Sequence, residues 1–160
     1  MQTYYLEMTD AEQLRASDRE VEEFAVQRVR IPYGSVNRFF YQTVGAKWDW
    51  RVRLAWTDTQ WQAYVEQPGL ETWISYVRGT PAGYFELARQ QGGEVQVAMF
   101  GVLPPFLGRG VGGMQLTAAL RQAWAEETRR VWLHTASSDH PHALANYQAR
   151  GMRLYRTETT

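Results

Sequence analysis

The chain has 160 residues, in which 17 lysines and arginines balance 17 aspartates and glutamates, and this neutral charge argues against a nucleic-acid partner. It contains no cysteine, which excludes disulfides, thiolate metal sites and a cysteine nucleophile. It has no apolar run long enough to span a membrane and no secretory leader, so we expect a single cytoplasmic domain over residues 1–160 with no membrane partner.

The first 70 residues predict short strands and helices. The expected elements are strands at 3–8 and 21–30 and helices at 35–44 and 59–66. We expect Ser35 to cap the first helix, with Phe39 and Phe40 facing inward, and Thr57-Asp58 to cap the second.

The remaining residues predict a three-stranded meander followed by alternating helices and strands. The expected elements are strands at 71–77, 84–89 and 94–102, a helix at 110–127, a strand at 130–135, a helix at 141–150 and a strand around 154–155. A glycine-rich turn at 79–83 should join the first two strands. This order predicts an α/β (α+β) fold with a mixed, largely antiparallel sheet of about six or seven strands and helices on both faces.

The turn from Leu107 to Gly113 lies between a strand and the longest expected helix. Glycines let backbone amides approach a ligand, and a helix start adds unpaired N–H groups, so the turn predicts a pyrophosphate site to which Arg109 can contribute. Two other interpretations remain open. The turn could be a plain loop, or it could bind a dinucleotide, because it also satisfies G-x-G-x-x-G. The spacer Pro104-Pro105 argues against the tight turn of a dinucleotide fold.

Two segments carry a family resemblance. Residues 102–112 (VLPPFLGRGVG) resemble the V-x-P-x-[YF]-[RQ]-G-x-G-[IV]-G signature of the GNAT superfamily of acyl-coenzyme-A N-acyltransferases, and residues 143–152 (ALANYQARGM) resemble its A-x-x-x-Y-x-x-x-G-F helix end. The sequence departs from these motifs at Leu107, where the family has Arg or Gln, and at Met152, where it has Phe. The resemblance implies a GNAT-type fold, with an acetyl-CoA-binding core at 71–160 and a variable acceptor-side region at 1–70.

The resemblance also implies the cofactor contacts. Acetyl-CoA would be the co-substrate, with no metal, and the expected binding residues are Phe100, Gly101, Val102, Leu107, Gly108, Arg109, Gly110, Val111, Gly112, Gly113, Asn146 and Tyr147.

The implied mechanism is direct attack of a primary amine on the thioester in a ternary complex. Tyr147 matches the family tyrosine that protonates the departing thiolate. The family's basic glutamate falls on Gln96, which cannot accept a proton, so the base stays open between Glu86, Glu94, His134 and a chain of water molecules.

The acceptor is expected to be an amine of a small molecule or a peptide. Trp48-Asp49-Trp50 places a carboxylate between two indoles, which can hold an ammonium by charge and cation–π attraction. Two histidines around Pro141 make a poor metal set, so we interpret Asp139 as a helix cap. The predicted function is an N-acetyltransferase, with a non-catalytic acyl-CoA-binding or regulatory module as the alternative and a dinucleotide-dependent oxidoreductase as a third hypothesis. Family habit also allows a homodimer.

Overall fold

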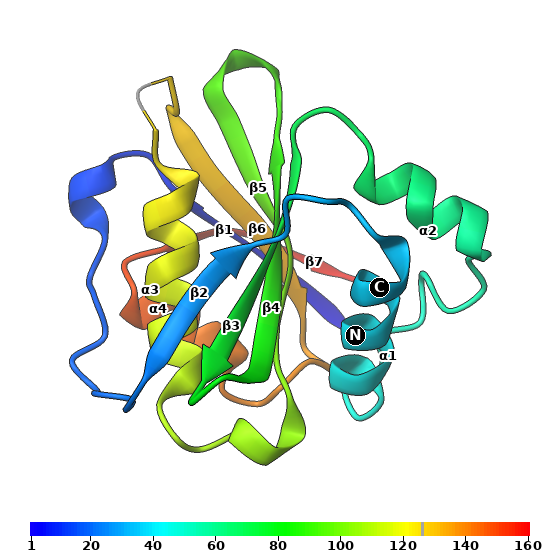
Figure 1. The fold of residues 1–160 in the computed structure, drawn as a ribbon. Coiled ribbons are helices and arrows are strands. Elements are labelled where there is room, and N and C mark those ends of the chain that lie inside the picture. Colours follow the sequence, from blue (N-terminus) through cyan, green and yellow to red (C-terminus); the bar gives the residue numbers. More distant parts are fainter. Residues whose placement is uncertain (126) are drawn as a thin grey trace.

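The computed structural model describes residues 1–125 and 127–160, and its strands form one seven-stranded sheet in the order β2-β3-β4-β5-β6-β1-β7 (Figure 1). The strands are β1 Gln2–Met8, β2 Phe24–Arg28, β3 Leu70–Val77, β4 Thr80–Arg89, β5 Glu94–Val102, β6 Arg130–Ala136 and β7 Arg153–Thr159. The helices are α1 Gly34–Gly45, α2 Asp58–Val65, α3 Val111–Ala123 and α4 Ala143–Ala149. Neighbouring strands are antiparallel except for the parallel pair β5–β6, which confirms the predicted mixed sheet.

Helices cover both faces of the sheet (Figure 1). On one face, Leu116 and Leu120 of α3 pack with Phe85 and Leu87 of β4, and all four side chains are fully buried. On the other face, Phe40 of α1 stacks on Tyr84 of β4 with ring centroids 4.9 Å apart. These two cores hold the sheet between the helices, as the sequence predicted.

Strands β5 and β6 are paired at one end only. Their ladder covers Glu94 to Gln96 and then stops, within the described part of the chain. A bulge shifts the β4–β5 register beside Leu87, and farther along, the Leu103 N–H donates to the Ala82 carbonyl at 2.7 Å. Because hydrogen-bonding directions alternate along a strand, the amides of Phe100 and Val102 point away from β4, toward the side where β6 has diverged.

Strand β1 lies inside the sheet between β6 and β7. Leu6 pairs with Leu133 on one side and with Leu154 on the other, so residues from both ends of the chain share this half of the sheet. The termini meet there, because the Thr160 N–H donates to the Met1 carbonyl at 2.9 Å. The sequence predicted this strand but not its place between β6 and β7.

The local predictions for α1 and α2 are right in part. Thr57 caps α2 in a capping box with Gln60, which confirms that cap. The cap at Ser35 is wrong: α1 begins at Gly34, and a Cβ there would lie 2.7 Å from the backbone of Trp61, so glycine lets the two helices approach. Phe40 is 2% exposed as predicted, but Phe39 is 52% exposed, because the buried face of α1 runs through Asn37, Phe40, Tyr41 and Val44 and leaves Phe39 beside it.

Three predicted boundaries in the second half shift. The β3–β4 turn is at Arg78-Gly79, with φ of 51° and 81°, instead of 79–83, so β4 begins at Thr80. Helix α3 ends at Ala123, and residue 126 of the predicted extension to 127 lies outside the described residues. Helix α4 begins at Ala143, two residues later than predicted. None of the helices in the described ranges is long and apolar enough to cross a bilayer.

Candidate functional site

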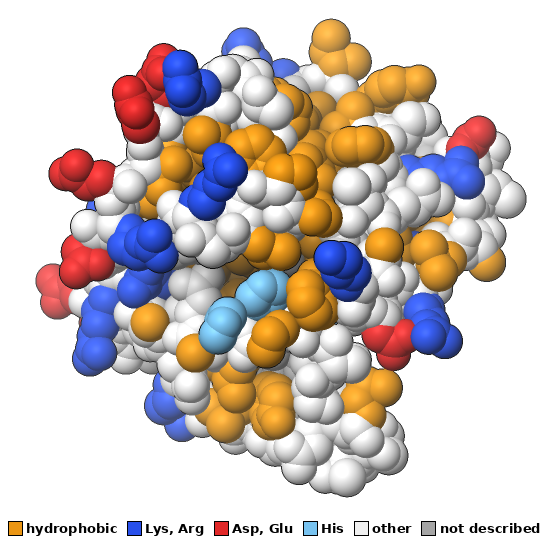
Figure 2. Space-filling model, turned by 90° about the horizontal axis from the view of Figure 1, so that it is seen from below, with side chains coloured by type: hydrophobic (Ala, Val, Ile, Leu, Met, Phe, Trp, Pro, Cys, Tyr) orange, Lys and Arg blue, Asp and Glu red, His pale blue; other side chains and the backbone are white. Residues whose placement is uncertain are grey.

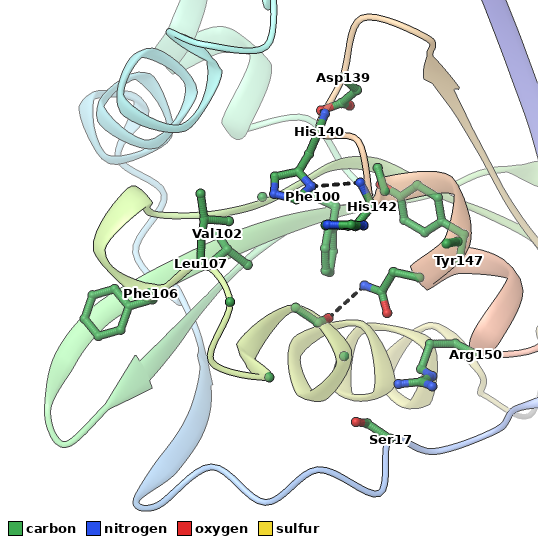
Figure 3. A pocket seen from close by; sticks show the side chains of 18 of the residues that line it. Ser17, Phe100, Val102, Phe106, Leu107, Asp139, His140, His142, Tyr147 and Arg150 are labelled. Carbon is green, nitrogen blue, oxygen red and sulfur yellow. Dashed lines mark hydrogen bonds between the residues drawn. The ribbon is translucent and has the colours of Figure 1, made fainter.

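A cavity of about 450 Å³ opens where β5 and β6 diverge, and residues of β5, the β5–α3 loop, α3 and α4 line it (Figure 3). This volume lies within the range of about 300–1,000 Å³ that is usual for small-molecule sites. The segment 17–19 and the loop after α1 complete the walls, so the cavity joins parts of the chain that are far apart in sequence.

The structure places most of the predicted cofactor residues on the wall of this cavity. These are Phe100, Gly101, Val102, Leu107, Gly108, Gly110, Gly112, Gly113, Asn146 and Tyr147. Val111 and Arg109 lie elsewhere. Val111 is 1% exposed and packs with Ala82 under the loop, and the Arg109 guanidinium lies 5.9 Å from the centre of the Phe106 ring.

The start of α3 faces the cavity with bare backbone. Gly110 is the N-cap in the left-handed region, with φ of 83°, and no described side chain caps this helix end. The first amides of α3 therefore keep their donors for a ligand, and the helix dipole adds positive potential. The Asn146 amide donates to the Gly112 carbonyl at 3.1 Å and ties α4 to this end of α3. This is an anion-binding geometry.

Two arginines that the sequence did not single out flank this helix start. A Cβ on Gly110 would lie 3.0 Å from Nε of Arg19, and one on Gly113 would lie 2.8 Å from Nη1 of Arg150. Nε of Arg150 is buried and finds no hydrogen-bond partner in the described residues. Ser17 holds the Arg19 segment in place, because its N–H donates to Thr117 Oγ1 of α3 at 3.0 Å.

Tyr147 lies between the two ends of the cavity and is 5% exposed (Figure 3). Its ring packs edge-on against Phe100, with centroids 6.0 Å apart. Burial, and to a smaller extent the charge of Asp139, raise the pKa of its hydroxyl. Tyr147 therefore keeps its proton at neutral pH and presents an O–H donor to the cavity.

The three residues of the predicted acceptor triplet, Trp48-Asp49-Trp50, do not all lie at the cavity. Trp48 and Trp50 line the cavity, whereas Asp49 is exposed, adopts a left-handed φ of 64° and forms an ion pair with Arg51. At this end of the cavity the carboxylate on the wall belongs instead to Asp139. Asp139 does not cap α4: His142 is the N-cap residue of that helix, and Asp139 Oδ1 accepts the His140 N–H at 2.7 Å.

The predicted bases do not lie on the cavity wall. Glu86 is fully buried beneath α1 and α2, where it binds Arg53, Tyr64 and Asn37. His134 is solvent-exposed on β6, and its ring lies beside that of Tyr5 with centroids 5.7 Å apart; partial desolvation of the imidazole lowers its pKa.

The two polar residues at the start of β5 are also engaged elsewhere. The Gln96 amide oxygen accepts from Gln90 at 3.2 Å, and Glu94 pairs with Arg130 at 2.9 Å. No group of three or more His, Cys, Asp or Glu that could hold a metal ion occurs in the described ranges.

The model of the acetyltransferase (GNAT) family matches residues 35–152, more than half of the chain, and the protein belongs to this family. Membership confirms the predicted resemblance and supports acyltransferase activity.

Several solved structures share this fold. A GCN5-related N-acetyltransferase from Kribbella flavida has a TM-score of 0.69 and 15% identity, over 98% of this chain and 56% of that one. An IAA acetyltransferase from Bacillus cereus has a TM-score of 0.64 and 18% identity, over 83% and 79%. An aminoglycoside acetyltransferase from an uncultured soil metagenomic sample has a TM-score of 0.62 and 12% identity, over 80% and 87%.

The chain spans about half the length of several structures that it matches, with 57%, 48% and 56% of those chains covered. A search of curated proteins gave no match.

Proposed function

We propose that the protein is an N-acetyltransferase that moves an acetyl group from acetyl-CoA to a primary amine by direct attack in a ternary complex. The observation that carries the proposal is the single cavity that joins the start of α3, the unpaired amides of β5 and the Tyr147 hydroxyl. Family membership supports the reaction class.

The α3 end of the cavity suits the pyrophosphate of coenzyme A. The amides after Gly110 supply donors, and Arg19 and Arg150 supply positive charge. The buried Nε of Arg150 has an unused donor, which a phosphate oxygen would satisfy. Leu107 provides only backbone at the position where the family has Arg or Gln, so these two arginines take over the side-chain contribution.

The β5 end of the cavity suits the thioester. Bound acetyl-CoA supplies an activated acetyl group and a thiolate leaving group. The amides of Phe100 and Val102 point to this side of β5, where they can donate to the carbonyl oxygen as negative charge develops on it. The Tyr147 hydroxyl can hydrogen-bond and protonate the sulfur.

Free-thiol release tests this proposal. The protein is incubated with acetyl-CoA and a panel of primary amines, while binding of coenzyme A is followed separately by calorimetry. We expect coenzyme A to bind and at least one amine to release thiol above the rate of hydrolysis. Binding of coenzyme A without thiol release from any amine of the panel would favour a non-catalytic acyl-CoA-binding module. This alternative exists because Gln96 occupies the position of the family base. Binding of NAD instead of coenzyme A would overturn both.

Replacement of the flanking arginines should weaken cofactor binding more than replacement of Arg109. Loss of one charge-assisted hydrogen bond costs about 1.5–3 kcal/mol, so Arg19→Ala or Arg150→Ala should each raise the dissociation constant of coenzyme A about 10- to 100-fold. Arg109→Ala is the control, an arginine just before the same helix start, and should change it less than about threefold, because Arg109 does not line the cavity and its guanidinium lies over the Phe106 ring. Calorimetry at two salt concentrations measures both effects. A larger loss of coenzyme A affinity in Arg109→Ala than in Arg19→Ala and Arg150→Ala would show that Arg109 makes the pyrophosphate contact.

A further inference from the structure

The end of the cavity away from α3 is an aromatic chamber with one carboxylate. Its walls include Trp48 and Trp50. His140 and Asp139 lie together at the same end of the cavity (Figure 3). The Trp48 and His140 ring centroids are 4.8 Å apart, so the loop after α1 and the loop before α4 close on each other here. Figure 2 shows neighbouring histidine side chains among hydrophobic ones on the hollowed face seen from below.

Trp50 connects this chamber to the thioester end of the cavity. A Cβ on Gly101 would lie 3.0 Å from Cη2 of Trp50, so the indole packs directly on the backbone of β5. The same side chain lies near enough to the Asp139 carboxylate to lower its pKa, and both residues line the cavity. Asp139 therefore lies one indole ring from the strand end that would hold the acetyl group.

The carboxylate of Asp139 is oriented but retains acceptor capacity. Its Oδ1 accepts the His140 N–H at 2.7 Å, and its Oδ2 accepts the Thr135 hydroxyl at 3.2 Å. A carboxylate has about four lone-pair sites, so these contacts leave room for a ligand N–H. Burial raises the pKa of Asp139, against the opposing effect of its hydrogen bonds with His140 and Thr135 and of the nearby Trp50 side chain. A cation next to Asp139 would offset the cost of that buried charge.

The chamber is matched to a single positive charge. Across the described wall of the cavity, the acidic residues are Asp18 and Asp139, and Asp18 belongs to the segment beside the start of α3. His140 does not add a competing cation, because burial and the neighbouring His142 lower its pKa. Its Nδ1 accepts the His142 N–H at 3.0 Å, which leaves the ring proton on Nε2.

We propose that Asp139 binds the acceptor as its ammonium and takes up the proton that must leave before attack, and that the acceptor is a primary amine with one charge on an apolar body. This inference rests on the proposed function and names the substrate class of the same site. It assigns to Asp139 the role that the sequence suggested for Asp49, and it distinguishes this chamber from one built for a multiply charged aminoglycoside.

The protons balance through Asp139 and Tyr147. An N–H bond of the ammonium breaks and its proton passes to Asp139; the nitrogen lone pair then forms the C–N bond as the C–S bond breaks. Tyr147 gives a proton to sulfur and regains one from Asp139, and the second proton of the nitrogen leaves to water. Because the charge of Asp139 helps to raise the pKa of Tyr147, protonation of Asp139 makes Tyr147 a better donor when the thiolate departs.

Binding of a matched pair of probes tests the proposal without turnover. Phenethylamine and 2-phenylethanol share an apolar body and differ in charge, and each is titrated by calorimetry into protein saturated with coenzyme A. We expect the wild type to prefer the amine, Asp139→Asn to weaken the amine about tenfold or more, and the alcohol to change less than about twofold. Asp49→Asn is the control and should change neither probe.

The stability of the variant separates binding from folding. Folding raises the pKa of Asp139, so the folded protein favours the protonated side chain. The contribution of Asp139 to stability is therefore present at low pH and is lost as the pH rises above the pKa that this residue has in the unfolded chain. At pH 7 the charged side chain therefore costs stability, and Asp139→Asn should melt at the same temperature as the wild type or higher.

Several results would overturn the proposal. They are equal loss of both probes in Asp139→Asn, no loss of either, loss of the amine in Asp49→Asn, or no preference of the wild type for the amine. Thiol release with amines but no effect of Asp139→Asn would reject this inference and leave the proposed function standing. Failure of the wild type to bind coenzyme A would reject both.

Discussion

Replacement of Glu86 by alanine is expected to lower the free energy of unfolding by about 3–5 kcal/mol, because it leaves a buried cation without its partner. Glu86 is fully buried on β4 and accepts from Arg53 Nη1 at 3.1 Å, from the Tyr64 hydroxyl at 2.7 Å and from Asn37 Nδ2 at 2.8 Å. The Arg53 guanidinium also lies 4.9 Å from the centre of the Trp56 ring. This cluster fixes α1, α2 and the loop between them on the sheet.

A double-mutant cycle measured by urea unfolding isolates the pair. Arg53→Met removes the cation, and the combination with Glu86→Ala should cost less than the sum of the two single changes, because neither charge is then left unpaired. Additive costs would show that the two residues do not stabilise each other.

The milder Glu86→Gln separates this structural role from the catalytic one predicted from the sequence. The amide oxygen can still accept from Tyr64, so we expect a smaller loss of stability and an unshifted acidic limb of the pH–rate profile. A shifted limb at unchanged stability would instead identify Glu86 as the base.

Tyr147→Phe is expected to lower kcat about 100- to 10,000-fold, the usual range for loss of a positioned proton donor. The dissociation constant of coenzyme A should stay within about twofold of the wild-type value, because phenylalanine keeps the ring that packs on Phe100. Steady-state thiol release and calorimetry measure the two quantities.

Tyr84→Phe is the matched control, because it also removes a buried phenol oxygen. The Tyr84 hydroxyl has no hydrogen-bond partner among the described residues and does not line the cavity, so its removal should leave kcat unchanged. Deprotonation of Tyr147 should not lower the kcat of the wild type up to about pH 10, because the pKa of that hydroxyl is raised above the ordinary value for a phenol. Equal kcat in Tyr147→Phe and wild type would remove the acid role.

The sequence predicted the parts of the site that depend on local backbone. A left-handed Gly110 before α3 and a tyrosine on a short amphipathic helix are fixed by neighbouring residues, so their patterns are visible in a single stretch. Arg19 and Asp139 were missed because each reaches the site from a loop whose path depends on distant packing. Arg19 approaches through the contact of Ser17 with Thr117, a pairing across 100 residues.

Asp49 is the converse case, because the sequence predicted it in the acceptor site and the structure places it away from the cavity. Two indoles around a carboxylate formed a plausible cation site in the sequence, but the backbone at Asp49 is left-handed and its side chain pairs with Arg51, while the two indoles line the cavity with Asp139. The composition of the triplet identified two aromatic residues of the cavity wall, whereas backbone conformation keeps its carboxylate away from that wall, and the cation site at Asp139 stays a proposal.

The interior place of β1 has a kinetic consequence. Leu6 lies between Leu133 and Leu154, so this half of the sheet is completed by contacts across nearly the whole chain. During synthesis, β1 leaves the ribosome before the other strands of the sheet and must wait for β6 and β7, with its apolar residues Leu6 and Met8 uncovered. Contacts of such high sequence separation slow folding. The meander of β3, β4 and β5 with α3 can form earlier, and insertion of β1 should be the late step that completes the domain.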